Sequence, residues 1–154
     1  EIALAPTFIP FHPWTTLAGY ADLLATLHTL GLVEAVAPIQ LAIRLLIPAG
    51  SLLLSDAAIR EQVGALDKEM LVHPWRHTDP EVEGLCERVM DVVQSAAPDE
   101  SRVETFQRIV AQLPSHVRPR LVDRVQWAAP TLSENWYCCA EPSSLQEDVL
   151  RAAL

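Results

Sequence analysis

Two of the three cysteines in this 154-residue chain, Cys138 and Cys139, are adjacent in the stretch ENWYCCAEP. Adjacent thiols can form a vicinal disulfide, bind a soft metal, or act as a nucleophile with a resolving partner. They follow Trp136 and Tyr137 and precede Pro142, which favours a loop, and loops often carry function. Two small buried side chains that only fill space fit the same pattern. The spacing leaves both interpretations open.

The third cysteine, Cys86, is predicted to be a core residue. It lies on the apolar stripe of a predicted helix, and free cysteine is among the most frequently buried residue types. No spacing supports a three-thiolate metal site that joins Cys86 to the adjacent pair.

Among the histidines, His12 has the most suggestive position. It lies in PFHPWTT, directly after a predicted parallel strand, and the C-terminal ends of such strands line the active sites of α/β folds. A surface loop histidine is the alternative. His73 and His77 have the i, i+4 spacing of a helical metal site, but Pro74 between them favours a loop.

The N-terminal third is predicted to form a strand, a helix and a second strand. The aromatic stretch APTFIPFHPW is typical of a strand that ends in a loop. Thr15 or Thr16 can cap a helix that Gly31 ends, and apolar residues recur in it at three- and four-residue steps. Residues 39–47 alternate between apolar and other side chains, which indicates a strand, although a buried helix remains an alternative. Two strands joined by a helix imply parallel pairing, and the unit needs further strands to cover its edges.

Beyond residue 54 the chain is predicted to be mostly helical. Ser55 or Asp56 begins a short helix that reaches about Gly64, and Asp99 begins a later one. The strongest helical signal follows Thr78 and Asp79, with Pro80 at the first turn. Its apolar stripe comprises Val82, Leu85, Cys86, Val89, Met90 and Val93. A final helix is expected after the cysteine pair, where Ser144 and Glu147 fit a capping box.

The amino-acid composition disfavours some classes of binding partner. The formal net charge is −9, which disfavours nucleic acid and anionic membrane surfaces. The most apolar run, residues 37–54, is interrupted by Gln40, Arg44 and Pro48, so no membrane span is expected. Three cysteines do not make a secreted disulfide framework, and a cytoplasmic location is expected. The chain starts at Glu1 without an initiator methionine, which suggests a piece of a longer protein.

Two segments together resemble a known family. The tail ENWYCCAEP resembles the one that names the CUAEP/CCAEP-tail radical S-adenosylmethionine (SAM) proteins, in which the position of Cys139 is selenocysteine in some members. Residues 6–54 resemble the last strand, helix and strand of a radical SAM barrel. Residues 11–16 then stand at the place of the family's Gly-Phe-Pro-Gly-Glu-Thr-like loop, without its glycines and glutamate, and residues 48–51 stand at its Pro-Gly-Thr-like segment.

The resemblance implies an α/β fold: the last βα elements of an incomplete barrel in residues 1–54, then a helical extension in residues 55–154. It implies SAM and a 4Fe–4S cluster as cofactors of the full-length protein, whose C-x3-C-x2-C cluster motif is absent from this chain. Cys138 and Cys139 are then the candidate catalytic residues, with a redox, nucleophilic or auxiliary metal role. His12, Pro13 and Trp14 are the candidate cofactor contacts. The expected partners are the remainder of the barrel and a small-molecule or peptide substrate.

Two other interpretations remain open from the sequence. The chain could be a non-enzymatic module that binds metal or cycles a thiol pair. It could also be a helical interaction domain in which the cysteines are incidental.

Overall fold

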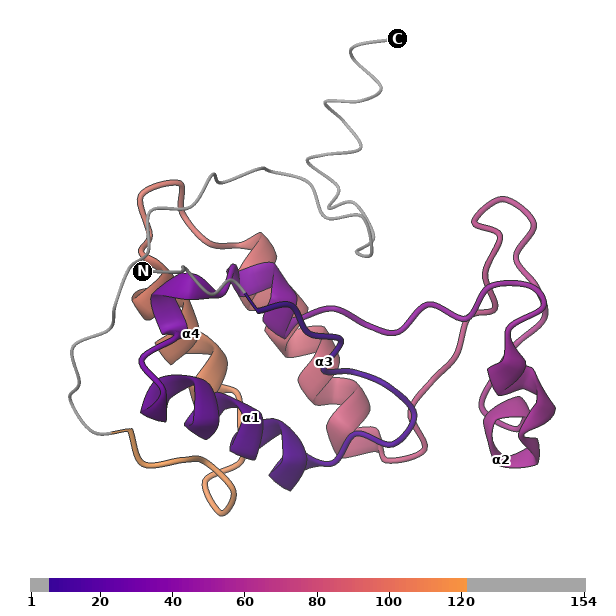
Figure 1. Cartoon of the computed structure of the whole chain (residues 1–154), viewed down its shortest axis with the longest axis horizontal. Coiled ribbons are helices and arrows are strands. Elements are labelled where there is room, and N and C mark those ends of the chain that lie inside the picture. The colour runs from indigo at the N-terminus through magenta and orange to yellow at the C-terminus, as the bar shows by residue number, and fades with distance from the viewer. Residues whose placement is uncertain (1–5, 122–154) are drawn as a thin grey trace, which may run out of the picture.

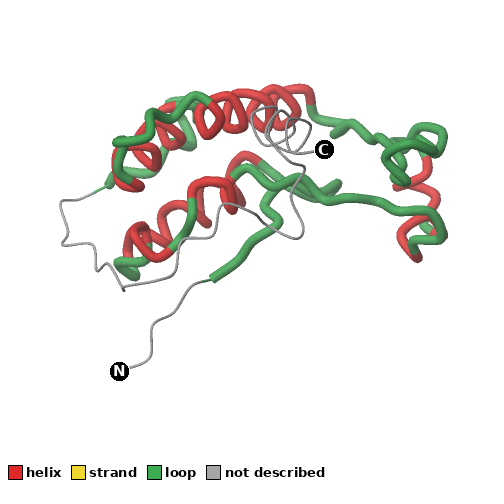
Figure 2. Tube along the Cα trace, turned by 90° about the horizontal axis from the view of Figure 1, so that it is seen from above, coloured by secondary structure: helices red, strands yellow, loops and turns green. Residues whose placement is uncertain are grey.

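The computed structural model describes residues 6–121, in which three helices form a group around the main core (Figures 1 and 2). They are α1 (Leu17–Thr29), α3 (Pro80–Gln94) and α4 (Arg102–Ala111). Two short 3₁₀ helices, η1 (Val33–Ala35) and η2 (Pro38–Leu41), pack against this group, η1 on α4 and η2 on α3 and α4. The enclosed core contains aromatic and aliphatic side chains from every one of these helices, including Tyr20, Leu24, Val33, Leu41, Leu85, Val89, Phe106 and Ile109.

The local signals at the ends of α1 and α3 are confirmed. The Thr16 hydroxyl accepts a hydrogen bond from the N–H of Gly19 at the start of α1. Gly31 follows the helix with a φ of 70°, a conformation that glycine adopts without steric cost. Asp79 caps α3, and Pro80 occupies its first turn, where no N–H is needed.

The expected start of α4 at Asp99 is wrong by a few residues. The helix begins after Ser101, whose hydroxyl accepts from the N–H of Glu104 while the Glu104 carboxylate accepts from the N–H of Ser101. This capping box satisfies two backbone donors at once, so it sets the start of the helix.

Replacing Ser101 with alanine is expected to lower the free energy of unfolding by about 1 kcal/mol, because the first turn of α4 loses its cap. Chemical denaturation followed by circular dichroism measures the change. Thr78→Ala, at an exposed position, is the control and should have no measurable effect. Equal effects of the two substitutions would contradict the capping role.

The predicted strand over residues 39–47 is wrong in its first half. Pro38–Leu41 forms η2 instead, with Pro38 in its first turn. The side chains do not alternate between two environments, because Leu41, Ala42 and Ile43 are all buried. Periodicity cannot separate a strand from a helix in a run that is buried on every side.

One parallel pairing follows η2 and joins the two ends of the predicted strand–helix–strand unit. Phe11 forms a parallel bridge with Arg44, in which the N–H of Phe11 donates to Ile43 O (3.2 Å) and the N–H of Leu45 donates to Phe11 O (2.8 Å). Helix α1 lies in the connection between them. The parallel order therefore agrees with the prediction at this pair, although within residues 6–121 the pairing stays an isolated bridge.

Residues 45–76 form a separate small lobe, which Figure 1 shows beside the three-helix group. It contains η3 (Leu52–Ser55) and α2 (Ala57–Arg60), so the helix expected to reach Gly64 is shorter than predicted. Antiparallel bridges join Pro48 to Val72 and Val63 to Trp75. The core of the lobe consists of Ile47, Ile59 and Trp75, with Leu45, Leu53, Leu54 and Val63 packed against them.

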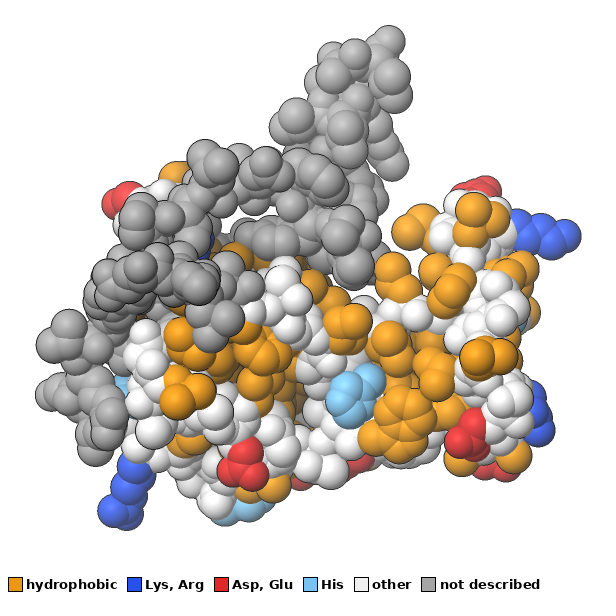
Figure 3. Space-filling view, viewed as in Figure 1, with side chains coloured by type: hydrophobic (Ala, Val, Ile, Leu, Met, Phe, Trp, Pro, Cys, Tyr) orange, Lys and Arg blue, Asp and Glu red, His pale blue; other side chains and the backbone are white. Residues whose placement is uncertain are grey.

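The lobe is only thinly covered. Leu52, Leu71 and Met70 are 88%, 67% and 53% exposed, and Figure 3 shows apolar side chains gathered over this part of the molecule. Residues on both sides of position 54 share the core of the lobe. The domain boundary expected at residue 54 and the expected fold class, a partial barrel, both stay predictions. Among the described residues no helix is both long and apolar enough to cross a membrane.

Candidate functional site

The predicted cofactor contacts His12, Pro13 and Trp14 form a tight turn directly after Phe11, at the C-terminal end of the parallel pair. Thr15 holds this turn closed. Its hydroxyl donates to Pro10 O (2.7 Å) and accepts from the N–H of His12 (2.9 Å), and its own N–H donates to His12 O (2.9 Å). The predicted loop after the first strand is thus present. The other predicted site residues, Cys138 and Cys139, lie outside the described residues, as does the expected final helix.

The turn presents two aromatic rings. The N–H of Trp14 donates to Nδ1 of His12 (3.2 Å), and the imidazole and indole centroids are 5.7 Å apart. Trp14 is 56% exposed, whereas His12 is half-buried. An open cavity of about 300 Å³ lies against these rings, and its other walls are formed by Phe8, Ile9, Pro10, Thr16, Tyr20 and Leu23.

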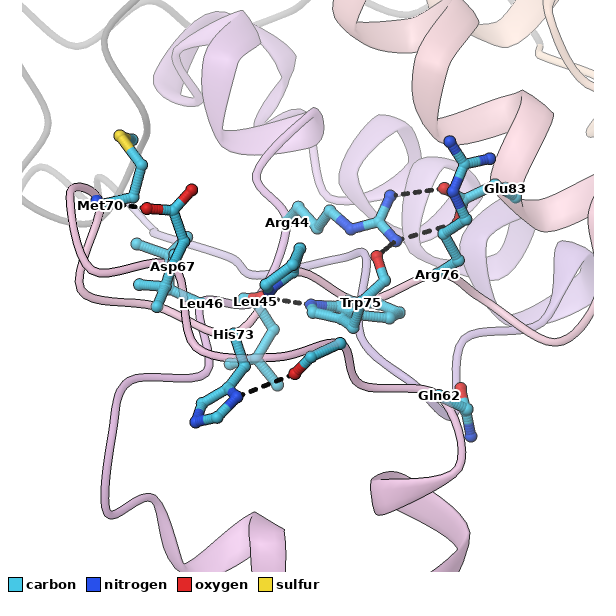
Figure 4. A pocket seen from close by; sticks show the side chains of 13 residues that line it. Arg44, Leu45, Leu46, Gln62, Asp67, Met70, His73, Trp75, Arg76 and Glu83 are labelled. Atoms are coloured by element: carbon cyan, nitrogen blue, oxygen red, sulfur yellow. Dashed lines mark hydrogen bonds and ion pairs between the residues drawn. The ribbon is translucent and has the colours of Figure 1, made fainter.

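Arg44 is the principal residue of the site that sequence reasoning missed. Its guanidinium donates to both carboxylate oxygens of Glu83, at 3.0 and 2.9 Å, and to Trp75 O at 2.5 Å (Figure 4). It also lies 4.0 Å from the centroid of the Trp75 ring. The sequence did contain a signal for this residue: Arg44 lies inside an apolar run, and a charged side chain that is buried requires a partner. The sequence could not name that partner, which is 39 residues away.

Glu83 links three segments of the chain. Besides Arg44 it accepts a hydrogen bond from the N–H of His77 at 2.8 Å, so it ties α3 to the segment that directly follows the small lobe. Burial by itself raises the pKa of Glu83, but the hydrogen bonds from Arg44 and His77 and the charges of Arg44 and Arg76 outweigh it. The pKa therefore lies below its ordinary value, and Glu83 is ionised at neutral pH.

Stability is expected to depend on pH through Glu83. Because its pKa is lower in the folded protein than in the unfolded chain, its contribution is complete above the ordinary value of 4.5. The contribution is lost as pH falls through the lowered folded value. Thermal unfolding of the wild type should therefore show a steeper loss of stability below pH 4.5 than unfolding of Glu83→Gln. Parallel pH profiles for the two proteins would contradict this assignment.

His77 carries a buried nitrogen without a partner. The N–H of Asp79 donates to Nδ1 of His77 at 3.0 Å, while Nε2 is buried and has no hydrogen-bond partner among the described residues. A narrow cavity, without room for a water molecule, separates His77 from His12. Its complete lining is Phe11, His12, Arg44, Trp75, His77, Val82, Glu83 and Cys86.

Cys86 is 7% exposed on α3, so the prediction of a core residue is confirmed. Burial raises the pKa of its thiol to about 11; the charge of Arg44 lowers it by less, and the charge of Glu83 raises it further. The thiol is therefore protonated at neutral pH and is a poor nucleophile and a poor metal ligand.

His73 and His77 do not act together. The loop predicted for HPWRH is confirmed, and Nδ1 of His73 contacts Gly64 O at 3.0 Å within the small lobe, away from α3. His73 lines an open cavity of about 630 Å³, with Leu45, Leu46 and Met70 among its apolar walls (Figure 4). This cavity adjoins the narrow one, since Arg44, Trp75 and Glu83 line both. In residues 6–121 no group of three or more His, Cys, Asp or Glu side chains is arranged to hold a metal ion.

Comparison with known proteins found no relative of this chain. No family model matches the chain, and neither a curated protein nor a solved structure matches it.

Proposed function

We propose that this chain is the C-terminal part of a radical SAM enzyme, in which the turn at His12 faces the cofactor and the Cys138–Cys139 tail takes part in the reaction. The observation that carries the proposal is the parallel pair of Phe11 and Arg44 joined through α1. Such a strand–helix–strand unit has open edges, and it suits the end of a larger parallel sheet. The tail CCAEP supports the same family from the sequence side.

The described residues do not fit the 4Fe–4S cluster. Cluster ligands are thiolates, whereas Cys86 is buried with a raised pKa. In this proposal the cluster belongs to a part of the longer protein that precedes Glu1.

The turn suits one wall of a site for SAM itself. It lies at the C-terminal end of parallel segments, where α/β proteins bind their ligands. The exposed indole of Trp14 offers a flat apolar face on which an adenine ring can stack. His12 lies beside it and can donate a hydrogen bond through Nε2, since its Nδ1 accepts from Trp14.

The tail is long enough for its proposed role. The described region ends at Leu121, which packs against the main core. About 17 residues separate Leu121 from Cys138, and an extended chain of that length spans up to about 55 Å. The cysteine pair can therefore reach the turn at His12 from where the described region ends.

The test begins with the coding sequence upstream of Glu1. An in-frame extension that contains C-x3-C-x2-C is expected, and a start codon at or just before Glu1 would overturn the enzyme proposal for this polypeptide. The full-length protein, purified without oxygen and supplied with dithionite as the one-electron reductant, should then cleave SAM to methionine and a 5′-deoxyadenosyl radical, which takes a hydrogen atom and is measured as 5′-deoxyadenosine.

The tail is tested in the same protein. Cys139→Ser should abolish product formation, while Ser143→Ala in the same tail serves as the matched control. Unchanged activity and metal content in Cys139→Ser would remove the cysteine pair from the mechanism.

A second candidate, a helical interaction domain, is favoured by one observation: the exposed apolar residues Leu52 and Leu71 of the small lobe. It predicts that the chain associates as its concentration rises and that Leu52→Asp with Leu71→Asp prevents the association. Analytical ultracentrifugation measures both, and a wild-type chain that stays monomeric contradicts this candidate.

A further inference from the structure

Five ionisable side chains meet around the narrow cavity at the C-terminal end of the parallel pair. They are His12, Arg44, His77, Glu83 and Cys86, brought together from the first turn, the second parallel segment, the end of the small lobe and α3. Ionisable groups that converge on one cavity are more typical of a binding site than of a structural core.

The two histidines present hydrogen-bond donors. Nδ1 of His12 accepts from the N–H of Trp14. Nδ1 of His77 lies 3.0 Å from the backbone nitrogen of Asp79 and 3.3 Å from Asp79 O, and we assign it as the acceptor of the shorter contact. A neutral imidazole that accepts at Nδ1 carries its hydrogen on Nε2. The buried Nε2 of His77 is therefore an N–H donor without an acceptor among the described residues. A metal ion needs a lone pair at this nitrogen, whereas a ligand oxygen satisfies the donor.

Glu83 already shows how a carboxylate is held here. Its two oxygens accept the parallel N–H groups of Arg44, and one of them also accepts from the N–H of His77. This fork is the usual way in which arginine binds a carboxylate. A ligand carboxylate would therefore compete with Glu83 for Arg44.

Residues 75–77 form a strap over the cavity. Its Trp75 end is held by the hydrogen bond from Arg44 to Trp75 O and also by bonds within the small lobe, from the indole N–H of Trp75 to Leu45 O and from the N–H of Arg76 to Gln62 O. Its other end is held by the hydrogen bond from the N–H of His77 to Glu83.

Arg44, Trp75 and Glu83 also line the open cavity of about 630 Å³, so a ligand reaches Arg44 from that side. The narrow cavity beyond has no room for a water molecule, so the ligand reaches Nε2 of His77 only when the strap moves. Release of Glu83 from Arg44 frees the carboxylate that holds His77, so the His77 end of the strap loosens while the Trp75 end stays bound to the small lobe.

We propose that this cavity is a gated binding site for a small carboxylate, in which Glu83 occupies Arg44 in the closed form and the ligand displaces it. The ligand's oxygens would then lie between the guanidinium of Arg44 and the Nε2–H of His77. This inference does not depend on the proposed function, because the residues involved are all within this chain and its test uses the chain alone.

The first experiment is a titration of the chain with sodium acetate, followed by NMR of ¹³C-labelled histidine rings, with sodium chloride at equal ionic strength as the reference. The ring signals of His12 and His77 should shift saturably with acetate, while those of His28 and His116 should not. Glu83→Gln should lower the acetate dissociation constant by about tenfold, because the internal competitor loses its charge. Glu81→Gln, on the exposed first turn of the same helix, is the matched control. Equal responses of all histidines, or to both salts, would overturn the site.

The second experiment measures the gate. In a Cys138→Ser, Cys139→Ser background, the alkylation rate of Cys86 reports access to the cavity. Glu83→Gln should raise this rate by about tenfold, with the helical circular dichroism unchanged, because local opening becomes more frequent. The Glu81→Gln rate should match that of the background protein. Equal rates in the two variants would remove the gate. If Glu83→Gln does not fold, the acetate titration of the wild type still decides the binding site.

Discussion

Replacing Leu85 with alanine is expected to lower the free energy of unfolding by about 3–4 kcal/mol, the largest single effect anticipated in this chain. Leu85 is 0% exposed in the main core, on the face of α3 that meets α4 and η2. Truncation removes buried apolar surface and leaves a cavity that packed helices cannot fill. Urea denaturation followed by circular dichroism measures the loss.

Leu52→Ala is the matched control for this prediction. The substitution is the same, but Leu52 is 88% exposed on the small lobe. We expect a change within about 0.5 kcal/mol. Similar losses for Leu85→Ala and Leu52→Ala would contradict the assignment of the core to the three-helix group.

Arg44→Gln is expected to cost about 2–3 kcal/mol, because Glu83 is left as a largely buried carboxylate without its main partner. The side chains of Arg44 and Glu83 are 27% and 14% exposed, so solvent replaces the lost bonds only in part. The face of the Trp75 ring also loses its cation. Arg120→Gln, at an exposed position, is the control and should have no measurable effect.

A double-mutant cycle separates the ion pair from the other contacts of Arg44. Glu83→Gln should be less costly in the Arg44→Gln background than in the wild type, with a coupling energy of about 1 kcal/mol or more. Additive effects would show that the two side chains do not stabilise each other, and would also weaken the competition by which we propose that Glu83 closes the cavity.

The two proposals concern the same end of the parallel pair but fail independently. Loss of the radical SAM proposal through an upstream start codon leaves the carboxylate site intact, because Arg44, His77 and Glu83 belong to the described chain. Failure of the acetate titration, in turn, leaves the role of Cys138 and Cys139 to be tested in the full-length protein. These cysteines lie outside the described residues, and their function remains a hypothesis from the sequence.

The sequence by itself determined the local features of this protein. A hydroxyl or carboxylate before an apolar stripe caps a helix through contacts a few residues away, so Thr16 and Asp79 mark the starts of α1 and α3. The apolar stripe of α3 likewise places Cys86 in the core, because one face of a surface helix must be buried.

Only the tertiary structure decided the features that depend on contacts between residues far apart in the sequence. Residues 40–43 of the apolar run are all buried, so their pattern could not distinguish the 3₁₀ helix η2 from the strand that was expected. Arg44 could be recognised as a charge in need of a partner, but only folding brings Glu83 and Trp75 to it. His12 and His77 meet at one cavity for the same reason. Contacts between residues far apart in the sequence depend on how the elements pack, which no local pattern records.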